Sequence, residues 1–181
     1  LFKYKQMDTK EIQNIIGKRQ VLLGHSPVCQ NISSIMYLDS TEFDVMSISK
    51  SGLLYDFEVK ISRADFKKDA LKNKHIFYKD GKNHSNRVPN YFYYVCPYGL
   101  IKEEEIPPYA GLLYIGDFEV IEVVTAPRIH SQKHDKLKIL NKVAQVYSER
   151  QFLGMCKLTY VNKEIRDKNK KRQEYLTNPS K

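Results

Sequence analysis

Residues 42–62, EFDVMSISKSGLLYDFEVKIS, decide the fold. From Leu53 onward, apolar and polar residues alternate strictly, and strict alternation predicts a β-strand with one buried face. The predicted apolar face carries Leu53, Tyr55, Phe57, Val59 and Ile61, and the other carries Asp56, Glu58, Lys60 and Ser62. Residues 42–48 also alternate, and Lys50-Ser51-Gly52 supplies a turn, so the two runs are predicted to form a hairpin.

The polar face of this hairpin has residues suited to phosphate chemistry. Asp44 lies on the first run, and Glu58 and Lys60 are same-face neighbours on the second, about 7 Å apart at ~3.3 Å per residue. Two carboxylates can hold a hard divalent cation, which polarises a phosphate and lowers the pKa of a bound water. A neighbouring lysine can orient that water and offset transition-state charge. The alternative is a surface hairpin with solvated charges.

The pattern Asp44…Glu58-Val59-Lys60 resembles the signature of the PD-(D/E)XK nuclease superfamily. Phe43 stands where the superfamily name places a proline. Three further stretches resemble the MmcB-like DNA-repair branch and its phage-encoded relatives: SRADF at 62–66, PNYFYYVCPYGLI at 89–101 and YAGLLY at 109–114. The likeness extends from about residue 42 to a predicted helix near residue 150.

The resemblance implies a Mg²⁺-dependent deoxyribonuclease, in which Mn²⁺ can substitute. Asp44, Glu58 and the backbone carbonyl of Val59 would ligate the metal, and Lys60 would position the attacking water. The implied products carry a 5′-phosphate and a 3′-hydroxyl. In the superfamily a glutamate on the first helix sometimes joins the metal site, and Glu11 is the local candidate. The alternative for Glu11 is a helix cap, because Asp8 lies three residues before it, at capping-box spacing.

The remaining periodicities fit an α/β fold with a restriction-endonuclease-like αβββαβ core. Its mixed central sheet would be flanked by helices and extended by a second hairpin and a C-terminal helix. The predicted elements are a helix at 8–19, a strand at 32–38, the hairpin at 42–61, a helix at 63–75, a strand at 90–96, a hairpin at 111–124 and a helix at 133–150.

Within the predicted helix at 63–75, we expect Ala64, Phe66 or Ala70, and Leu71 to face inward. The lysines, Lys67, Lys68, Lys72 and Lys74, are expected to face solvent. We assign residues 1–156 to a single nuclease-like domain and residues 157–181 to a basic C-terminal tail.

The charge balance favours a polyanionic partner. The chain has 30 Lys and Arg against 21 Asp and Glu, a net charge of +9, and such an excess steers nucleic acid toward a protein. Candidate DNA contacts are Arg63, Lys67, Arg87, Lys170, Lys171 and Arg172. A solvated basic surface is the alternative for the more distant lysines.

Sequence patterns argue against several other classes of protein. No apolar run approaches the ~20 residues of a membrane span, so no membrane partner is expected. The three cysteines show no CxxC or zinc spacing, which indicates reduced thiols and a cytoplasmic protein. The family resemblance implies that the host is a bacterial cell or a phage-infected one. No phosphate-binding glycine loop is present.

These observations predict a nuclease that acts on DNA in repair, recombination or phage DNA processing. Two alternatives stay open at this point. One is a catalytically silent nucleic-acid-binding module, and the other is a junction resolvase on the same core. A resolvase works as a paired enzyme, so a homodimer is compatible with the sequence but is not indicated by it.

Overall fold

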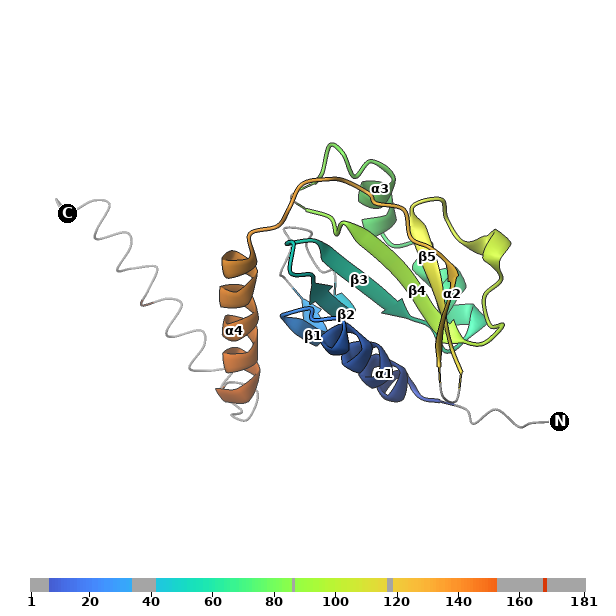
Figure 1. The fold of residues 1–181 in the computed structure, drawn as a ribbon, viewed down its shortest axis with the longest axis horizontal. Helices are drawn as coiled ribbons and strands as arrows, with labels where there is room; N and C mark the ends of the chain where they lie inside the picture. The colour runs from blue at the N-terminus through green and yellow to red at the C-terminus, as the bar shows by residue number, and fades with distance from the viewer. Residues whose placement is uncertain (1–6, 34–41, 86, 117–118, 153–167, 169–181) are drawn as a thin grey trace. The chain divides into compact units, whose positions relative to one another are not determined.

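The computed structural model describes residues 7–33, 42–85, 87–116, 119–152 and 168 (Figure 1). One compact unit, Leu1–Val143, contains the sheet, and Ala144–Lys181 forms a second unit. The elements in chain order are α1 (Thr9–Leu22), β1 (Val28–Ser33), β2 (Glu42–Ile48), β3 (Leu54–Val59), α2 (Arg63–Asp69), α3 (Lys74–Lys79), β4 (Tyr91–Pro97), the 3₁₀ turn η1 (Glu103–Glu105), β5 (Ala110–Ile115), β6 (Val120–Val124) and α4 (Lys136–Phe152).

A single six-stranded mixed sheet organises the first unit, in the order β1-β2-β3-β4-β5-β6. The β1–β2, β2–β3 and β5–β6 pairs are antiparallel, while β3–β4 and β4–β5 are parallel. Both predicted hairpins are therefore confirmed. The parallel β3–β4 pair needs a crossover connection, and α2 and α3 provide it.

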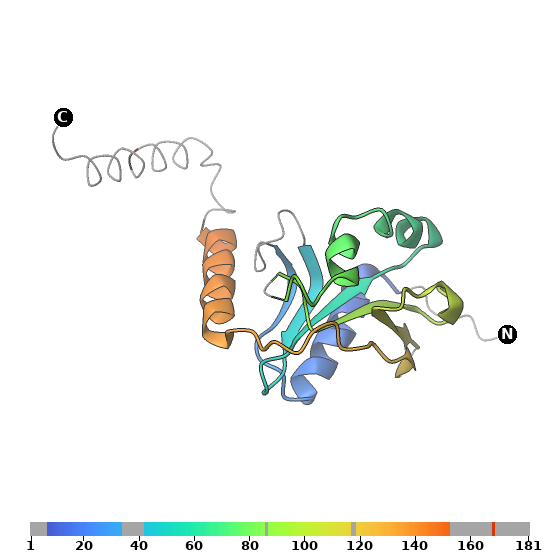
Figure 2. The same ribbon diagram turned by 90° about the horizontal axis from the view of Figure 1, so that it is seen from above.

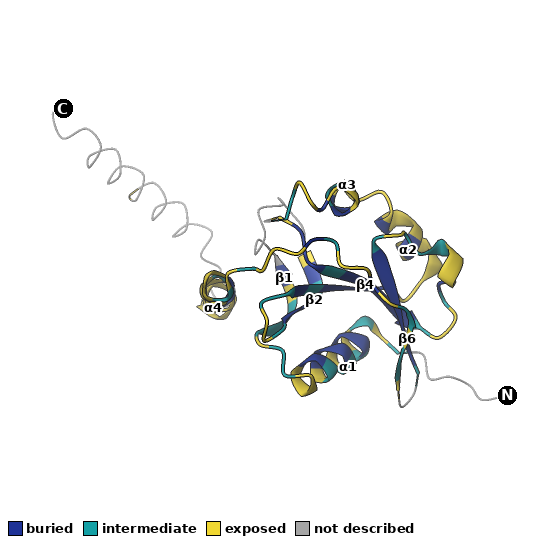
Figure 3. Ribbon diagram, turned by 45° about the horizontal axis from the view of Figure 1, so that its top comes forward, coloured by how far each residue is buried: buried dark blue, intermediate teal, exposed yellow. Residues whose placement is uncertain are grey.

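Helices cover both faces of this sheet. Figures 2 and 3 show α1 on one side of the strands and α2 and α3 on the other. The core under α1 includes Ile12 and Ile16 packed with Phe57 and Val95, and the opposite core includes Phe66 packed with aromatic rings of β4. The fold is thus α/β with a mixed sheet between helical layers. The sequence periodicities predicted this fold class and this layered arrangement.

The hairpin alternation is confirmed as far as Val59, where β3 ends, but Ile61, expected on the apolar face, is exposed. The polar face is buried rather than solvated. Asp56, Glu58 and Lys60 are all 3 % exposed or less, because α2 and α3 cover them. The alternative of a surface hairpin with solvated charges is therefore wrong. Charged groups buried in this way need partners of opposite charge, which directs attention to the side chains that α2 and α3 contribute.

The predicted helix at 63–75 is wrong in its length and in three side-chain directions. It is divided into α2 and α3; Ala64 and Leu71, which were expected to face inward, are exposed, Leu71 by 84 %, and Lys74 is only 3 % exposed. Lys72 and Lys74 both contact Glu58. Residues two apart on a continuous helix do not face the same side, so the chain leaves helical geometry between Asp69 and Lys74.

Two boundaries near the N-terminus also differ from expectation. The first helix continues to Leu22, and the first strand is Val28–Ser33, earlier than the predicted 32–38. Cys29 and Ile32 are both buried although they are three residues apart, so this strand places apolar residues on both faces and shows no period of two. Residues 34–38 lie outside the described part of the chain.

β2 separates from β3 at the position of Asp44. The last register partners of this pair are Val45 and Phe57, whereas β1 stays paired with β2 as far as Ser33 and Glu42. The backbone amide of Val59, beyond the last paired residues, donates instead to the Asp44 side chain at 2.8 Å. This fork in the sheet therefore holds Asp44 beside the end of β3.

Candidate functional site

The structure brings the predicted triad to one region of the sheet. Asp44 lies at the fork, and Glu58 and Lys60 project from the end of β3 toward α2 and α3. Burial and the charge of Glu58 raise the pKa of Asp44 to about 6. Two carboxylates thus lie near enough to oppose each other's ionisation, as in sites that bind cations.

Glu58 is enclosed by three lysine ammonium groups. Its Oε1 accepts from Lys60 Nζ at 2.6 Å and Lys72 Nζ at 2.7 Å, and its Oε2 accepts from Lys74 Nζ at 2.5 Å. Glu58 and Lys74 are buried, while Lys72 is 51 % exposed. Both carboxylate oxygens are therefore already satisfied by protein donors.

Asp69 is a second carboxylate in this cluster, and no sequence pattern indicated it. It is fully buried and contacts Lys60 Nζ at 3.1 Å and Lys72 Nζ at 2.6 Å. Its other oxygen bonds His75 Nε2 and the Tyr94 hydroxyl, both at 2.9 Å. Although burial opposes ionisation, these contacts hold the pKa of Asp69 far below its ordinary value. Asp69 is consequently a fixed anion that helps orient Lys60.

Lys60 lies between the two carboxylates. Burial alone would lower its pKa, but Glu58 and Asp69 raise it above the ordinary value. Its backbone amide donates to Val95 O at 2.8 Å, which anchors this position beside β4. Lys60 is thus a positioned ammonium group at neutral pH, suited to stabilising negative charge.

Asp56 is a buried acid next to this cluster on the same face of β3. Its Oδ2 accepts from the Tyr78 hydroxyl at 2.9 Å, and its Oδ1 has no hydrogen-bond partner in the described structure. Burial raises the pKa of Asp56 to about 7. The alternation placed Asp56 beside Glu58, but only burial in the tertiary structure brings its pKa near neutral pH.

The other predicted site residues differ in their contacts and exposure. Glu11 forms the predicted capping box with Asp8, so its carboxylate is engaged at the start of α1. Arg63 donates to both Glu105 carboxylate oxygens, Nη2 to Oε1 at 2.6 Å, and to Leu100 O at 3.2 Å, so its guanidinium is already occupied. Lys67 and Arg87 are exposed, and Lys170, Lys171 and Arg172 lie outside the described residues.

The donor set at the fork fits a hard divalent cation. Asp44 and Glu58 supply carboxylate oxygens and Val59 a carbonyl, and oxygen ligands of this kind suit Mg²⁺. Burial and, to a smaller extent, the charge of Glu58 disfavour the ionised form of Asp44, and a bound cation would favour it. Among the described residues, no group of three or more His, Cys, Asp or Glu side chains is placed to hold a metal. A metal bound by Asp44 and Glu58 would therefore need the Val59 carbonyl or water molecules as further ligands. To bind the metal, Glu58 would have to give up one of its contacts with a lysine ammonium group.

Comparison with known proteins adds information on the fold only. No protein-family model and no curated protein matches the chain. Among solved structures, the chain is similar to the SPO1766 protein of unknown function from Silicibacter pomeroyi, with a TM-score of 0.58 and 16 % sequence identity over 84 % of this chain and 97 % of that chain. No helix in the described residues is long and apolar enough to cross a membrane.

Proposed function

We propose that the protein is a metal-dependent nuclease that hydrolyses DNA phosphodiester bonds. The observation that carries the proposal is the convergence of Asp44, Glu58 and Lys60 at the fork between β2 and β3. The element order α1-β1-β2-β3-α2/α3-β4 supports a restriction-endonuclease-like αβββαβ core. The net charge of +9 supports a polyanionic substrate.

In this proposal each residue has a separate role. Asp44, Glu58 and the Val59 carbonyl hold Mg²⁺, which supplies an activated water and polarises the phosphate when bound. Lys60 orients the water and stabilises charge that develops on the phosphate oxygens. Asp69 acts through Lys60, because its hydrogen bond fixes the ammonium group between two carboxylates. Asp69 is thus a positioning residue.

A second candidate function, a catalytically silent nucleic-acid-binding module, is favoured by the ion pairs around Glu58. Lys60, Lys72 and Lys74 neutralise this carboxylate without a metal. In that case the charged cluster would serve only to join α2 and α3 to the sheet. Breaking such a buried cluster would destabilise the fold and would leave no nuclease activity to lose.

Cleavage assays on Lys60→Met distinguish the two functions. The wild-type protein is incubated with supercoiled, linear and branched DNA in Mg²⁺, Mn²⁺ or EDTA. A nuclease cuts only with metal, and Lys60→Met loses cleavage by roughly 10²-fold or more, as expected when an electrostatic contact to the transition state is removed. Metal-dependent DNA binding should be retained, because Lys60 is not a ligand.

Lys68→Met is the matched control, because Lys68 is exposed on α2 and belongs neither to the proposed catalytic group nor to the candidate DNA contacts. Circular dichroism melting checks that Lys60→Met remains folded. Metal-dependent cleavage at the wild-type rate by a folded Lys60→Met protein would remove Lys60 from the mechanism. Absence of cleavage by the wild-type protein on all three substrates, with DNA binding retained, would favour the silent module.

A further inference from the structure

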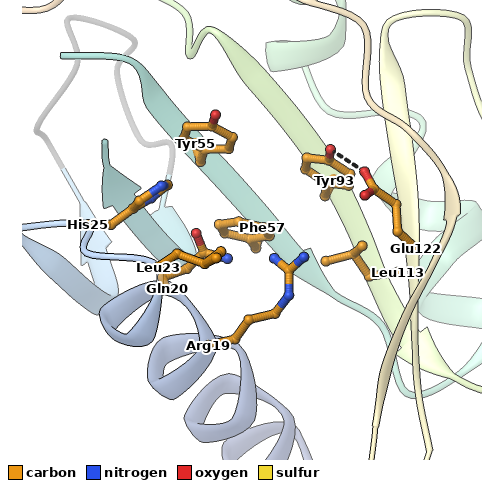
Figure 4. A pocket seen from close by; sticks show the side chains of 9 residues that line it. All are labelled: Arg19, Gln20, Leu23, His25, Tyr55, Phe57, Tyr93, Leu113 and Glu122. Atoms are coloured by element: carbon orange, nitrogen blue, oxygen red, sulfur yellow. Dashed lines mark hydrogen bonds between the residues drawn. The ribbon is translucent and has the colours of Figure 1, made fainter. Parts of the chain in front are cut away.

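A cavity of about 180 Å³ lies between the end of α1 and the sheet (Figure 4). Phe57 and Tyr93, which line it, belong to the core under α1, on the face opposite the charged cluster. The last turns of α1 form one side of the cavity through Arg19 and Gln20. Aromatic side chains of β3 and β4, namely Tyr55, Phe57 and Tyr93, form the sheet side. Ligand cavities that enclose drug-sized molecules are roughly 300–1,000 Å³, so this one suits a single small ring system.

Gln20 offers an unused hydrogen-bond donor to the cavity. Its side chain is 1 % exposed, and its Nε2 has no partner in the described structure. Figure 4 shows this nitrogen turned toward Phe57 and Arg19. A buried amide group without a partner costs free energy, so a ligand that accepts from it would recover that cost.

A short hydrogen-bond chain fixes which end of the Gln20 amide faces the cavity. Ser47 Oγ donates to Gln20 Oε1 at 3.4 Å, and His25 Nδ1 lies 2.9 Å from the same hydroxyl. Burial and the nearby Arg19 lower the pKa of His25, which favours the neutral ring. With the Ser47 hydroxyl donating to Gln20, its oxygen can accept from His25 when Nδ1 carries the hydrogen. The Gln20 oxygen is therefore engaged, and only its NH₂ group is available to a ligand.

Arg19 adds a second, charged donor. Its side chain is half-buried at the cavity, and no described residue forms an ion pair with it. The nearby carboxylate of Glu122 instead accepts from the Tyr93 hydroxyl at 2.7 Å. Arg19 and Gln20 thus present donors only, which selects a ligand with acceptor oxygens and negative charge.

The aromatic side chains supply flat apolar contact area. Tyr55 and Phe57 are nearly parallel, at an interplanar angle of 10° and a centroid distance of 6.3 Å, and Phe57 is similarly aligned with Tyr93 at 16° and 5.6 Å. Such rings stack on nucleobases, and this contact does not depend on base identity. Recognition of a particular base would therefore depend on the hydrogen-bond donors of Gln20 and Arg19.

We propose that this cavity binds the base of one nucleotide, a carbonyl-bearing pyrimidine that lies against the aromatic rings, with the phosphate of the same nucleotide facing Arg19. The Gln20 NH₂ group would donate to a carbonyl oxygen of the base. Thymine and uracil present such oxygens. Adenine has no carbonyl oxygen and can accept only through ring nitrogens, and its two-ring base is larger than the single small ring system that the cavity suits. The nucleotide can be free or part of a single strand, because both share this chemistry.

This site is independent of the proposed nuclease activity. Phe57 and Tyr93 belong to the core under α1, while Glu58 and Tyr94 face α2 and α3. Residues of the two sites lie on opposite faces of the same strands. Loss of nucleotide binding would therefore leave DNA cleavage unchanged, and loss of cleavage would leave nucleotide binding unchanged.

Isothermal titration calorimetry tests the proposal with dTMP, thymidine, dAMP and a short oligo(dT). We expect dTMP to bind more tightly than dAMP by about tenfold or more, and thymidine to bind more weakly than dTMP because it lacks the phosphate. Gln20→Leu should weaken dTMP binding by about tenfold, and Arg19→Met by about 10–100-fold. Tighter binding of oligo(dT) than of dTMP would show that the ligand is a nucleotide within a single strand rather than a free nucleotide.

Lys18→Met is the control for non-specific attraction, since Lys18 is exposed and adjacent to Arg19 on α1. It should retain dTMP binding. If Gln20→Leu does not fold, Arg19→Met carries the test, because Arg19 is only half-buried. Undetectable dTMP binding by the wild-type protein, equal binding of dTMP and dAMP, or equal losses in Arg19→Met and Lys18→Met would overturn the proposal.

Discussion

The ion pair between Lys74 and Glu58 predicts a large and specific loss of stability on substitution. Lys74→Met keeps the length of the side chain but removes the ammonium group 2.5 Å from Glu58 Oε2. Breaking a buried pair by removing one partner costs about 3–5 kcal/mol. Glu58 keeps its contacts with Lys60 and Lys72, so we expect the lower end, about 3 kcal/mol.

Lys72→Met is the matched comparison. Lys72 contacts the same carboxylate at 2.7 Å, but its side chain is 51 % exposed and is screened by solvent. Its removal should cost about 1 kcal/mol or less. At about 2–4 °C per kcal/mol for a chain of this size, Lys74→Met should lower Tm by roughly 6–12 °C and Lys72→Met by only a few degrees.

Thermal and urea unfolding followed by circular dichroism would measure both effects, and added Mg²⁺ extends the test. Lys74→Met frees Glu58 Oε2, so under the nuclease proposal Mg²⁺ should raise the Tm of this variant more than that of the wild-type protein. Equal stabilities of Lys74→Met and Lys72→Met would refute the idea that burial makes the Lys74 contact the stronger one. An equal response of Lys74→Met and wild-type protein to Mg²⁺ would count against a cation site at Glu58.

Two further predictions concern pH and the C-terminal tail. Burial raises the pKa of Asp56 to about 7 from the ordinary 3.8, so the native state holds this proton more tightly than the unfolded chain does. Its contribution to stability is therefore fully present below about pH 4 and is lost as pH rises through about 7. Asp56→Asn should gain stability relative to wild type between pH 5 and pH 8 in urea unfolding, and a difference that does not change with pH would contradict the assignment. Deleting residues 162–181 should weaken DNA binding and reduce the slope of log K against log salt concentration, because fewer phosphates are neutralised. An unchanged slope in a salt titration would exclude the tail from the DNA contact.

Local sequence periodicity was sufficient for the central hairpin. The alternation through β3 correctly placed Glu58 and Lys60 on one face, because a period of two follows from strand geometry alone. It was not sufficient to show that this face is buried. A charged face normally indicates solvent, and only the packing of α2 and α3 supplies the opposite charges that make burial tolerable.

The positions that sequence reasoning missed depend on contacts between distant segments. Lys74 was expected to face solvent and Leu71 to face the core, as helix periodicity dictates, but the opposite is found. Lys72 and Lys74 are two residues apart and both contact Glu58, and these contacts outweigh the helix propensity of the segment. The cavity side chain Gln20 was missed for a related reason, since its partner Ser47 lies 27 residues away.

The fork between β2 and β3 makes one backbone group a reporter of side-chain ionisation. The Val59 amide donates to Asp44 Oδ2 rather than to a neighbouring strand, and the pKa of Asp44 is about 6. Its NMR chemical shift and its rate of hydrogen exchange will therefore change as the carboxylate titrates, whereas amides within the strand ladder keep carbonyl acceptors that do not ionise. Occupancy of the fork by a cation would be visible at the same nucleus without any substitution or label beyond ¹⁵N.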